Sequence, residues 1–91
     1  MALYTFILEY NGGTYISQVR AQSPKSSIKK WLNHLVKDPT LGLPSKTIKE
    51  LDDRLKADSP IPLEGIFNAW CISAIIRGQS ALVHLVQTHE G

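Results

Sequence analysis

The residues best suited to nucleophilic chemistry are a cysteine, a serine and a histidine in the last quarter of the chain. Cys71 and Ser73 lie in one apolar run, and His84 lies in the next. If these runs pair as an antiparallel hairpin with Gly78-Gln79 as its loop, Ser73 faces His84 and Cys71 lies one diagonal away on the same face. A thiol or hydroxyl beside an imidazole is the arrangement that a Cys/His-dependent hydrolase or transferase uses.

Two observations favour a structural role for these residues. A free cysteine is among the most often buried residue types and behaves as a small apolar side chain. The same hairpin offers no acidic residue placed to orient the imidazole of His84. We therefore expect a protein that is not an enzyme, and Cys71, His84 and Ser73 remain an alternative.

The ligands for a metal ion are few. The chain has one cysteine and three histidines, and it contains no CxxC or HExxH spacing. His84 and His89 are five positions apart, so on one strand they point to opposite faces. The sequence therefore predicts no metal site and no cofactor.

Basic residues are concentrated in the second quarter of the chain and just beyond it. Seven basic residues lie between Arg20 and Lys49, where Asp38 is the only acidic one. Such asymmetry is typical of proteins with an anionic partner, although lysines also solvate the outer face of an ordinary helix. The candidates for nucleic-acid contact are Arg20, Lys25, Lys29, Lys30 and Lys37. Four strand aromatics would stack on bases if exposed, or join the core if covered: Tyr4, Tyr10, Tyr15 and Trp70.

Two alternating runs, 3–10 and 14–21, predict a β-hairpin at the start of the chain. Asn11-Gly12 between them favours a type I′ turn, in which both central residues have positive φ. Either two-residue loop, Asn11-Gly12 or Gly12-Gly13, places the same side chains together on the expected core face: Tyr4, Phe6, Leu8, Tyr10, Tyr15, Ser17, Val19 and Ala21. The other face carries Ile7 and Ile16.

Two helices are expected next. Residues 24–37 form an amphipathic helix, with Ser23 as N-cap and Pro24 in its first position. Its apolar stripe consists of Ile28, Trp31, Leu32, Leu35 and Val36. Residues 45–57 predict a second helix with a narrower stripe.

The C-terminal runs 66–76 and 81–88 are predicted as a second hairpin, because β-branched and aromatic residues dominate them. A helix over 64–77 is the alternative, since periodicity alone does not settle an apolar run this short. The first run is apolar on both faces, which is typical of a central strand covered on both sides.

These elements give an α+β fold, a two-layer ββααββ sandwich with an antiparallel sheet of about four strands and helices on one face. The uncovered sheet face stays partly apolar, and such a face usually finds a partner. We therefore expect a homodimer, with Ile7, Ile16 and Trp70 as interface candidates.

Length and composition limit the number of domains and the class of protein. The chain of 91 residues is predicted to be a single domain, and its 43% apolar and 20% charged residues are ordinary for a globular protein. One cysteine excludes an internal disulfide. No apolar run approaches the roughly 20 residues of a membrane helix, and the first residues do not resemble a signal peptide. We expect a cytoplasmic protein without membrane contact.

The segment from Tyr4 to Tyr15 resembles the first hairpin of HicB-type antitoxins, and the helix after it is similar too. This resemblance covers about a third of the chain and implies a toxin-binding or regulatory role. The Pro-Asp-Leu and Gly-Cys signature of the family's third strand is missing, and residues 45–88 do not match.

The functional hypothesis from sequence is a small intracellular, non-enzymatic binding module that forms a homodimer and acts by protein contact. The first alternative is a nucleic-acid-binding or antitoxin-like regulatory protein that uses the basic face of helix 24–37. The second is the Cys/His-dependent enzyme.

Overall fold

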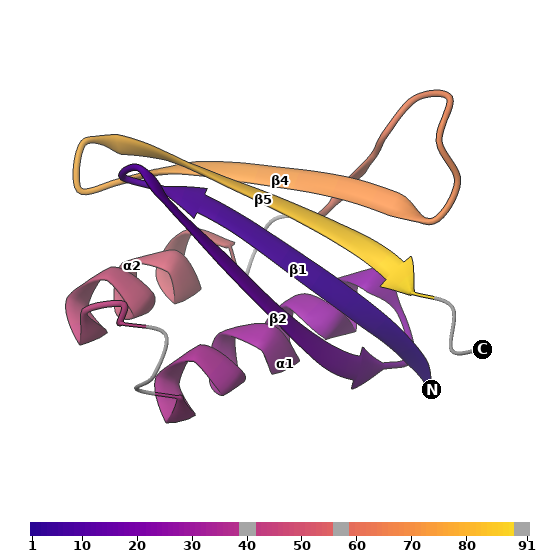
Figure 1. The fold of residues 1–91 in the computed structure, drawn as a ribbon, viewed down its shortest axis with the longest axis horizontal. Helices are drawn as coiled ribbons and strands as arrows, with labels where there is room; N and C mark the ends of the chain where they lie inside the picture. Colours follow the sequence, from indigo (N-terminus) through magenta and orange to yellow (C-terminus); the bar gives the residue numbers. More distant parts are fainter. Residues whose placement is uncertain (39–41, 56–58, 89–91) are drawn as a thin grey trace.

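A five-stranded antiparallel sheet forms one layer of the molecule, and two helices pack on one of its faces (Figure 1). The computed structural model describes residues 1–38, 42–55 and 59–88. Its elements, in chain order, are β1 (Ala2–Tyr10), β2 (Gly13–Ala21), α1 (Pro24–Lys37), α2 (Ser45–Leu55), β3 (Ile61–Pro62), β4 (Ala69–Ile76) and β5 (Gln79–Thr88). The predicted α+β class is confirmed. The predicted ββααββ order with four strands is wrong by one strand, because the short β3 precedes β4.

The first and last long strands lie side by side in the middle of the sheet. The strand order is β2-β1-β5-β4-β3, so β1 pairs with β2 on one side and with β5 on the other. The contact between the two ends of the sequence therefore joins the two hairpins into one sheet. This pairing places Ile7 between Ile16 and His84.

The N-terminal hairpin and the bounds of α1 confirm the predictions made from local signals, but Val36, predicted in the apolar stripe of this helix, is 69% exposed. Asn11 has φ 49° and Gly12 has φ 79°, as a type I′ turn requires. Helix α1 begins at Pro24, and the Ser23 side chain accepts a hydrogen bond from the backbone N–H of Ser26 at 3.1 Å. This cap satisfies one of the otherwise unpaired N–H groups at the helix start. Helix α2 is observed over Ser45–Leu55, and residues 56 and 57 of its predicted range lie outside the described residues.

The second hairpin is formed by β4 and β5, so the alternative helix over 64–77 is wrong. Its turn consists of Arg77 and Gly78, with φ values of 52° and 79°. The carboxylate of Glu50 on α2 accepts a hydrogen bond from the backbone N–H of Arg77 at 2.6 Å. This contact ties α2 to the turn end of β4.

The core lies between the sheet and the helices. The ring of Phe6 stacks on that of Trp31, with centroids 4.8 Å apart and an interplanar angle of 8°. Around them, the buried apolar residues from strands and helices form one cluster: Tyr4, Leu8, Tyr10, Ile28, Leu32, Leu35, Ile48, Leu51, Leu55, Ile72, Ile76, Val83 and Leu85. We call this sheet face the covered face and the opposite one the open face.

Candidate functional site

Alternate residues of every long strand point to the open face, where neither helix packs (Figure 1). They alternate along each strand with the residues that face the helices, and Ala69 is the one among them that is buried: Leu3, Thr5, Ile7 and Glu9 of β1; Thr14, Ile16, Gln18 and Arg20 of β2; Ala69, Cys71, Ser73 and Ile75 of β4; and Ser80, Leu82, His84 and Val86 of β5. The expectation that strand 66–76 is covered on both sides is therefore wrong for this face.

A row of five residues crosses the middle of the open face from one edge of the sheet to the other. The strand pairings align Ile16 with Ile7, Ile7 with His84, His84 with Cys71, and Cys71 with Ile61. We call Ile16, Ile7, His84, Cys71 and Ile61 the central row. Ile16 is 59% exposed and Ile61 is 69% exposed, while the inner three are half-buried. The row is thus a mainly aliphatic strip that solvent reaches.

Further aliphatic side chains flank the central row. Ile75 is 59% exposed and Val86 is 37% exposed, and Leu3 and Leu82 are half-buried on the same face. Beside them, polar groups satisfy one another: Nε2 of Gln18 donates a hydrogen bond to Oγ1 of Thr5 at 2.9 Å, and the hydroxyls of Thr5 and Thr88 share a second. Hydrogen bonds already made within a surface lower the cost of removing it from water.

Charge is scarce on this face. Among the described strand residues that point to it, only Glu9 and Arg20 carry formal charges. They lie at opposite ends of the strands, because Glu9 pairs with Thr14 next to the first turn and Arg20 pairs with Leu3 at the other end. The middle of the open face is therefore uncharged.

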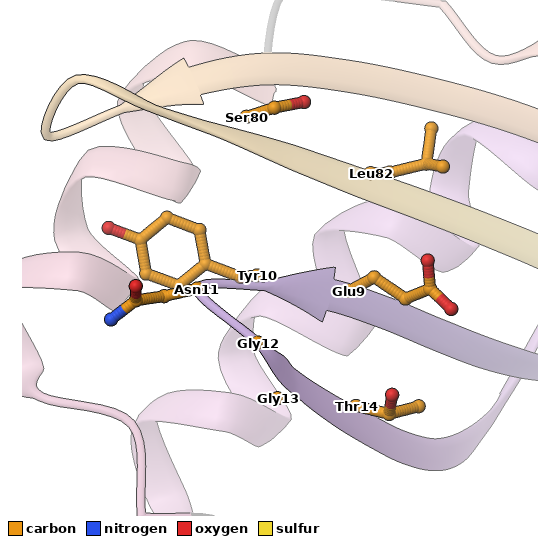
Figure 2. Close-up of a pocket in the computed structure, with 8 residues that line it drawn as sticks. All are labelled: Glu9, Tyr10, Asn11, Gly12, Gly13, Thr14, Ser80 and Leu82. Atoms are coloured by element: carbon orange, nitrogen blue, oxygen red, sulfur yellow. The ribbon is translucent and has the colours of Figure 1, made fainter.

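A shallow pocket of about 440 Å³ lies at the turn end of the open face. Figure 2 shows the side chains of Glu9, Thr14 and Ser80 around it, from three strands. One carboxylate and two hydroxyls suit polar contacts with a partner. The lining includes no thiol or imidazole, so no base of the histidine type lies beside these hydroxyls in the pocket.

The structure corrects the register predicted for Cys71, Ser73 and His84. Because the turn is Arg77-Gly78 rather than Gly78-Gln79, Cys71 lies directly opposite His84, and Ser73 lies opposite Leu82. The side chains of Cys71 and His84 make no hydrogen bond or ion pair within the described part of the chain. No acidic group orients the imidazole there. The three residues thus share one face, but within the described residues no acidic side chain orients His84 as the third member of a catalytic triad would.

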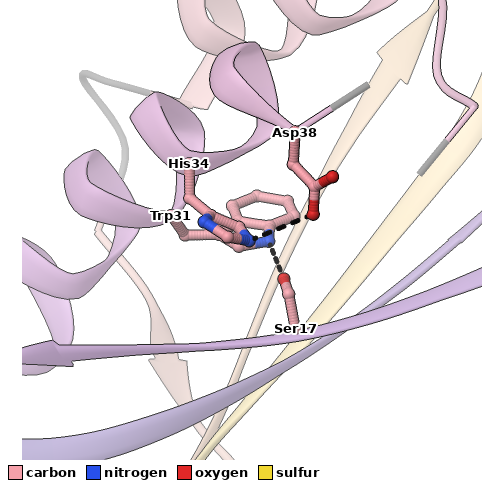
Figure 3. Close-up of polar contacts among 4 residues, drawn as sticks. All are labelled: Ser17, Trp31, His34 and Asp38. Atoms are coloured by element: carbon pink, nitrogen blue, oxygen red, sulfur yellow. Dashed lines mark hydrogen bonds and ion pairs between the residues drawn. The ribbon is translucent and has the colours of Figure 1, made fainter. Parts of the chain in front are cut away.

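The predicted basic ridge is divided between two sides of the molecule. Lys25, Lys29, Lys30 and Lys37 are exposed on α1, whereas Arg20 points to the open face and has an interaction partner. Helix α1 is fixed in orientation by Nε1 of Trp31, which donates a hydrogen bond to Oγ of Ser17 at 3.1 Å (Figure 3). At its C-terminal end, Nε2 of His34 lies 3.7 Å from Oδ2 of Asp38 (Figure 3).

All four strand aromatics lie on the covered face. Tyr4 and Tyr10 are buried, and Oη of Tyr10 donates a hydrogen bond to the carbonyl oxygen of Ile76 at 3.1 Å. Tyr15 and Trp70 are half-buried and pack against the core. The rings of Tyr4 and Trp70 lie 6.1 Å apart at 59°. The four rings therefore belong to the core or its margin, and Trp70 does not share a surface with Ile7 and Ile16.

Sequence reasoning missed an apolar edge and loop next to the open face. Ile61 joins the sheet through β3, and the loop 63–68 that follows exposes Ile66 and Phe67, the latter to 93%. The signal was the Pro60-Ile61-Pro62 segment, because proline in a strand is tolerated at a sheet edge. Ile75 and Val86 were also missed as members of the exposed surface.

Comparisons with protein-family models, with curated proteins and with solved structures found no match for this chain. Within the described residues, no helix combines the length and apolar character needed to cross a membrane.

Proposed function

We propose that the protein is a small, non-enzymatic binding module that forms a homodimer through the open face of its sheet. The central row carries this proposal, because five strands contribute to one continuous, mainly aliphatic strip with exposed isoleucines at both ends. The isoleucines are β-branched and restricted at χ1, so they lose less conformational entropy on association than long flexible side chains do. Their burial is therefore available to stabilise a complex.

A second copy of the chain fits this surface by size. The four long strands present a face of roughly 500 Å² in projection, which β3 and the loop 63–68 extend. Stable interfaces bury about 600–1,000 Å² on each partner. The open face as a whole is thus of the size that a modest dimer needs.

The charges support a two-fold arrangement. Two open faces packed around an axis that runs along the central row bring the Glu9 end of one sheet over the Arg20 end of the other. Opposite charges at opposite ends of one surface make that surface self-complementary, as a two-fold interface requires. The uncharged middle avoids burying an unpaired ion.

The decisive experiment is the mass of the protein in solution with glutamate introduced at each end of the central row. Ile16→Glu and Ile61→Glu should each convert a dimer into a monomer at micromolar concentration, measured by sedimentation equilibrium. Val36→Glu is the matched control, since Val36 is an exposed aliphatic residue, 69% exposed, on α1. Loss of the dimer in Ile16→Glu alone would instead indicate pairing through the edge of β2, and a monomeric wild-type protein would refute the proposal.

A second candidate function is nucleic-acid binding by α1. It is favoured by four exposed lysines on this helix, which has no acidic residue in its first turn. Four neutralised phosphates on single-stranded RNA predict a slope of about −3 for log affinity against log salt. Charge reversal at Lys29 and Lys30 should abolish that binding and leave the dimer mass unchanged. Absence of binding at low salt would exclude this candidate.

A further inference from the structure

Cys71 and His84 lie directly opposite each other in the central row, on β4 and β5. Directly opposed residues on antiparallel strands have Cβ atoms about 4.5–5.5 Å apart. A thiolate sulfur and an imidazole nitrogen that bind the same zinc ion are roughly 3.5 Å apart, given the usual Zn–S and Zn–N distances. Side-chain rotation alone can bring this sulfur and nitrogen to one ion, so the pair offers two of the four ligands that a structural zinc site uses.

The polar atoms of these two side chains are the next observation. Both are half-buried, and neither makes a hydrogen bond or ion pair within the described residues. Their neighbours in the row are Ile7 and Ile61. Covering an imidazole with apolar groups is costly when its nitrogens are unpaired. When a second copy covers the open face, a metal ion bound there would coordinate one of the imidazole nitrogens of His84.

One chain alone provides too few ligands. No group of three or more histidine, cysteine and acidic residues that could hold a metal occurs within the described part of the chain, whereas structural zinc sites use four ligands. A two-fold axis along the central row places the Cys71–His84 pair of one copy over that of the other. Packed sheets lie about 10 Å apart, so each side chain needs to reach only about 5 Å to the midplane.

We propose that the Cys71–His84 pairs of two copies of this chain bind one zinc ion at the centre of the dimer, a site that rests on the proposed open-face homodimer. Each thiol loses its proton to solvent on binding, and each imidazole binds in its neutral form. Two thiolates and one Zn²⁺ then sum to zero charge. A neutral site matches an uncharged, aliphatic surround, and two sulfur and two nitrogen ligands form the tetrahedral set that zinc prefers.

The test compares the protein stripped of metal by a chelator with the same protein after zinc addition. We expect one zinc per two chains and a dimer at least tenfold tighter with zinc, measured by sedimentation equilibrium and metal analysis. Cobalt(II) in place of zinc should give thiolate-to-metal absorption. Cys71→Ala and His84→Leu should lose metal binding and still dimerise without metal, because both replacements keep the row apolar. His34→Ala removes a histidine on α1 and should retain the site.

The possible results distinguish failure of the zinc site from failure of the homodimer. A dimer of equal affinity with and without zinc, with no cobalt–thiolate absorption, would overturn the metal site and leave the homodimer standing. A monomer under both conditions would overturn both proposals. One metal per chain in a monomer, or metal binding that survives in Cys71→Ala and His84→Leu, would overturn the shared site.

Discussion

The two faces of the sheet are made by alternate residues of the same strands, and they have very different surroundings. On the covered face, Phe6, Leu8 and Val83 have no exposed surface, while on the open face Ile16 and Ile75 are each 59% exposed. The strand aromatics lie on the covered face, whereas aliphatic side chains are mixed with polar ones on the open face. Both faces carry aliphatic residues, but only those beneath α1 and α2 are fully buried by folding of one chain.

The largest effect should come from the covered face. Phe6→Ala removes a ring that is fully buried and stacked on Trp31, and we expect it to lower the free energy of unfolding by about 3–5 kcal/mol. Ile16→Ala on the open face should cost less than about 1 kcal/mol in the monomer. Urea titration of both variants checks this. Equal losses would show that the two faces do not differ in their contribution to folding.

The next effect should appear in association rather than folding. Ile16→Glu places a carboxylate within the proposed interface on both copies, where it would be buried without a partner. We expect the dissociation constant of the dimer to rise about 100-fold, which corresponds to about 2.8 kcal/mol. Sedimentation equilibrium measures it, and far-UV circular dichroism should confirm an unchanged fold. The same rise in Val36→Glu would point to the helix side instead.

A smaller effect on folding alone should follow from Ser23→Ala. The Ser23 hydroxyl caps α1 through the N–H of Ser26, and its loss should cost about 1 kcal/mol. Because α1 packs only on the covered face, the dimer dissociation constant should stay the same once the variant is folded. A change in dimer affinity at constant folded fraction would contradict the separation of the two faces.

Local signals predicted the covered face well. The Ser23-Pro24 start and the spacing of Ile28, Trp31 and Leu35 define α1 to the residue, and Asn11-Gly12 defines the first turn. These predictions succeeded because each depends on neighbours within a few positions, as caps, turns and helical periodicity do.

The strand pairing that builds the open face could not be predicted in the same detail. The contact of β1 with β5 joins residues about 80 positions apart, and no local pattern encodes it. Arg77 is an unusual residue for positive φ, so the second turn was placed one residue late and the Cys71–His84 pairing was missed. Trp70 was assigned to the interface because the 66–76 run is apolar on both sides.

The smallest effect concerns the alkaline limit of stability. Burial raises the pKa of the Tyr4 phenol above its usual value, so the unfolded chain releases this proton at lower pH than the folded chain does. Stability should therefore fall as the pH rises above about 10. Tyr4→Phe should lessen that fall and leave the slope near pH 7 unchanged, as thermal unfolding across pH would show. Identical alkaline slopes in both proteins would contradict the burial of this phenol.

The most direct test of the open face as an interface is the mass of the wild-type protein in solution. Sedimentation equilibrium at micromolar concentration should give twice the chain mass of 10.1 kDa, and Ile16→Glu and Ile61→Glu should each give the chain mass, while Val36→Glu keeps the dimer. A wild-type mass equal to that of one chain, with or without zinc, would contradict the assignment of the open face to a second copy.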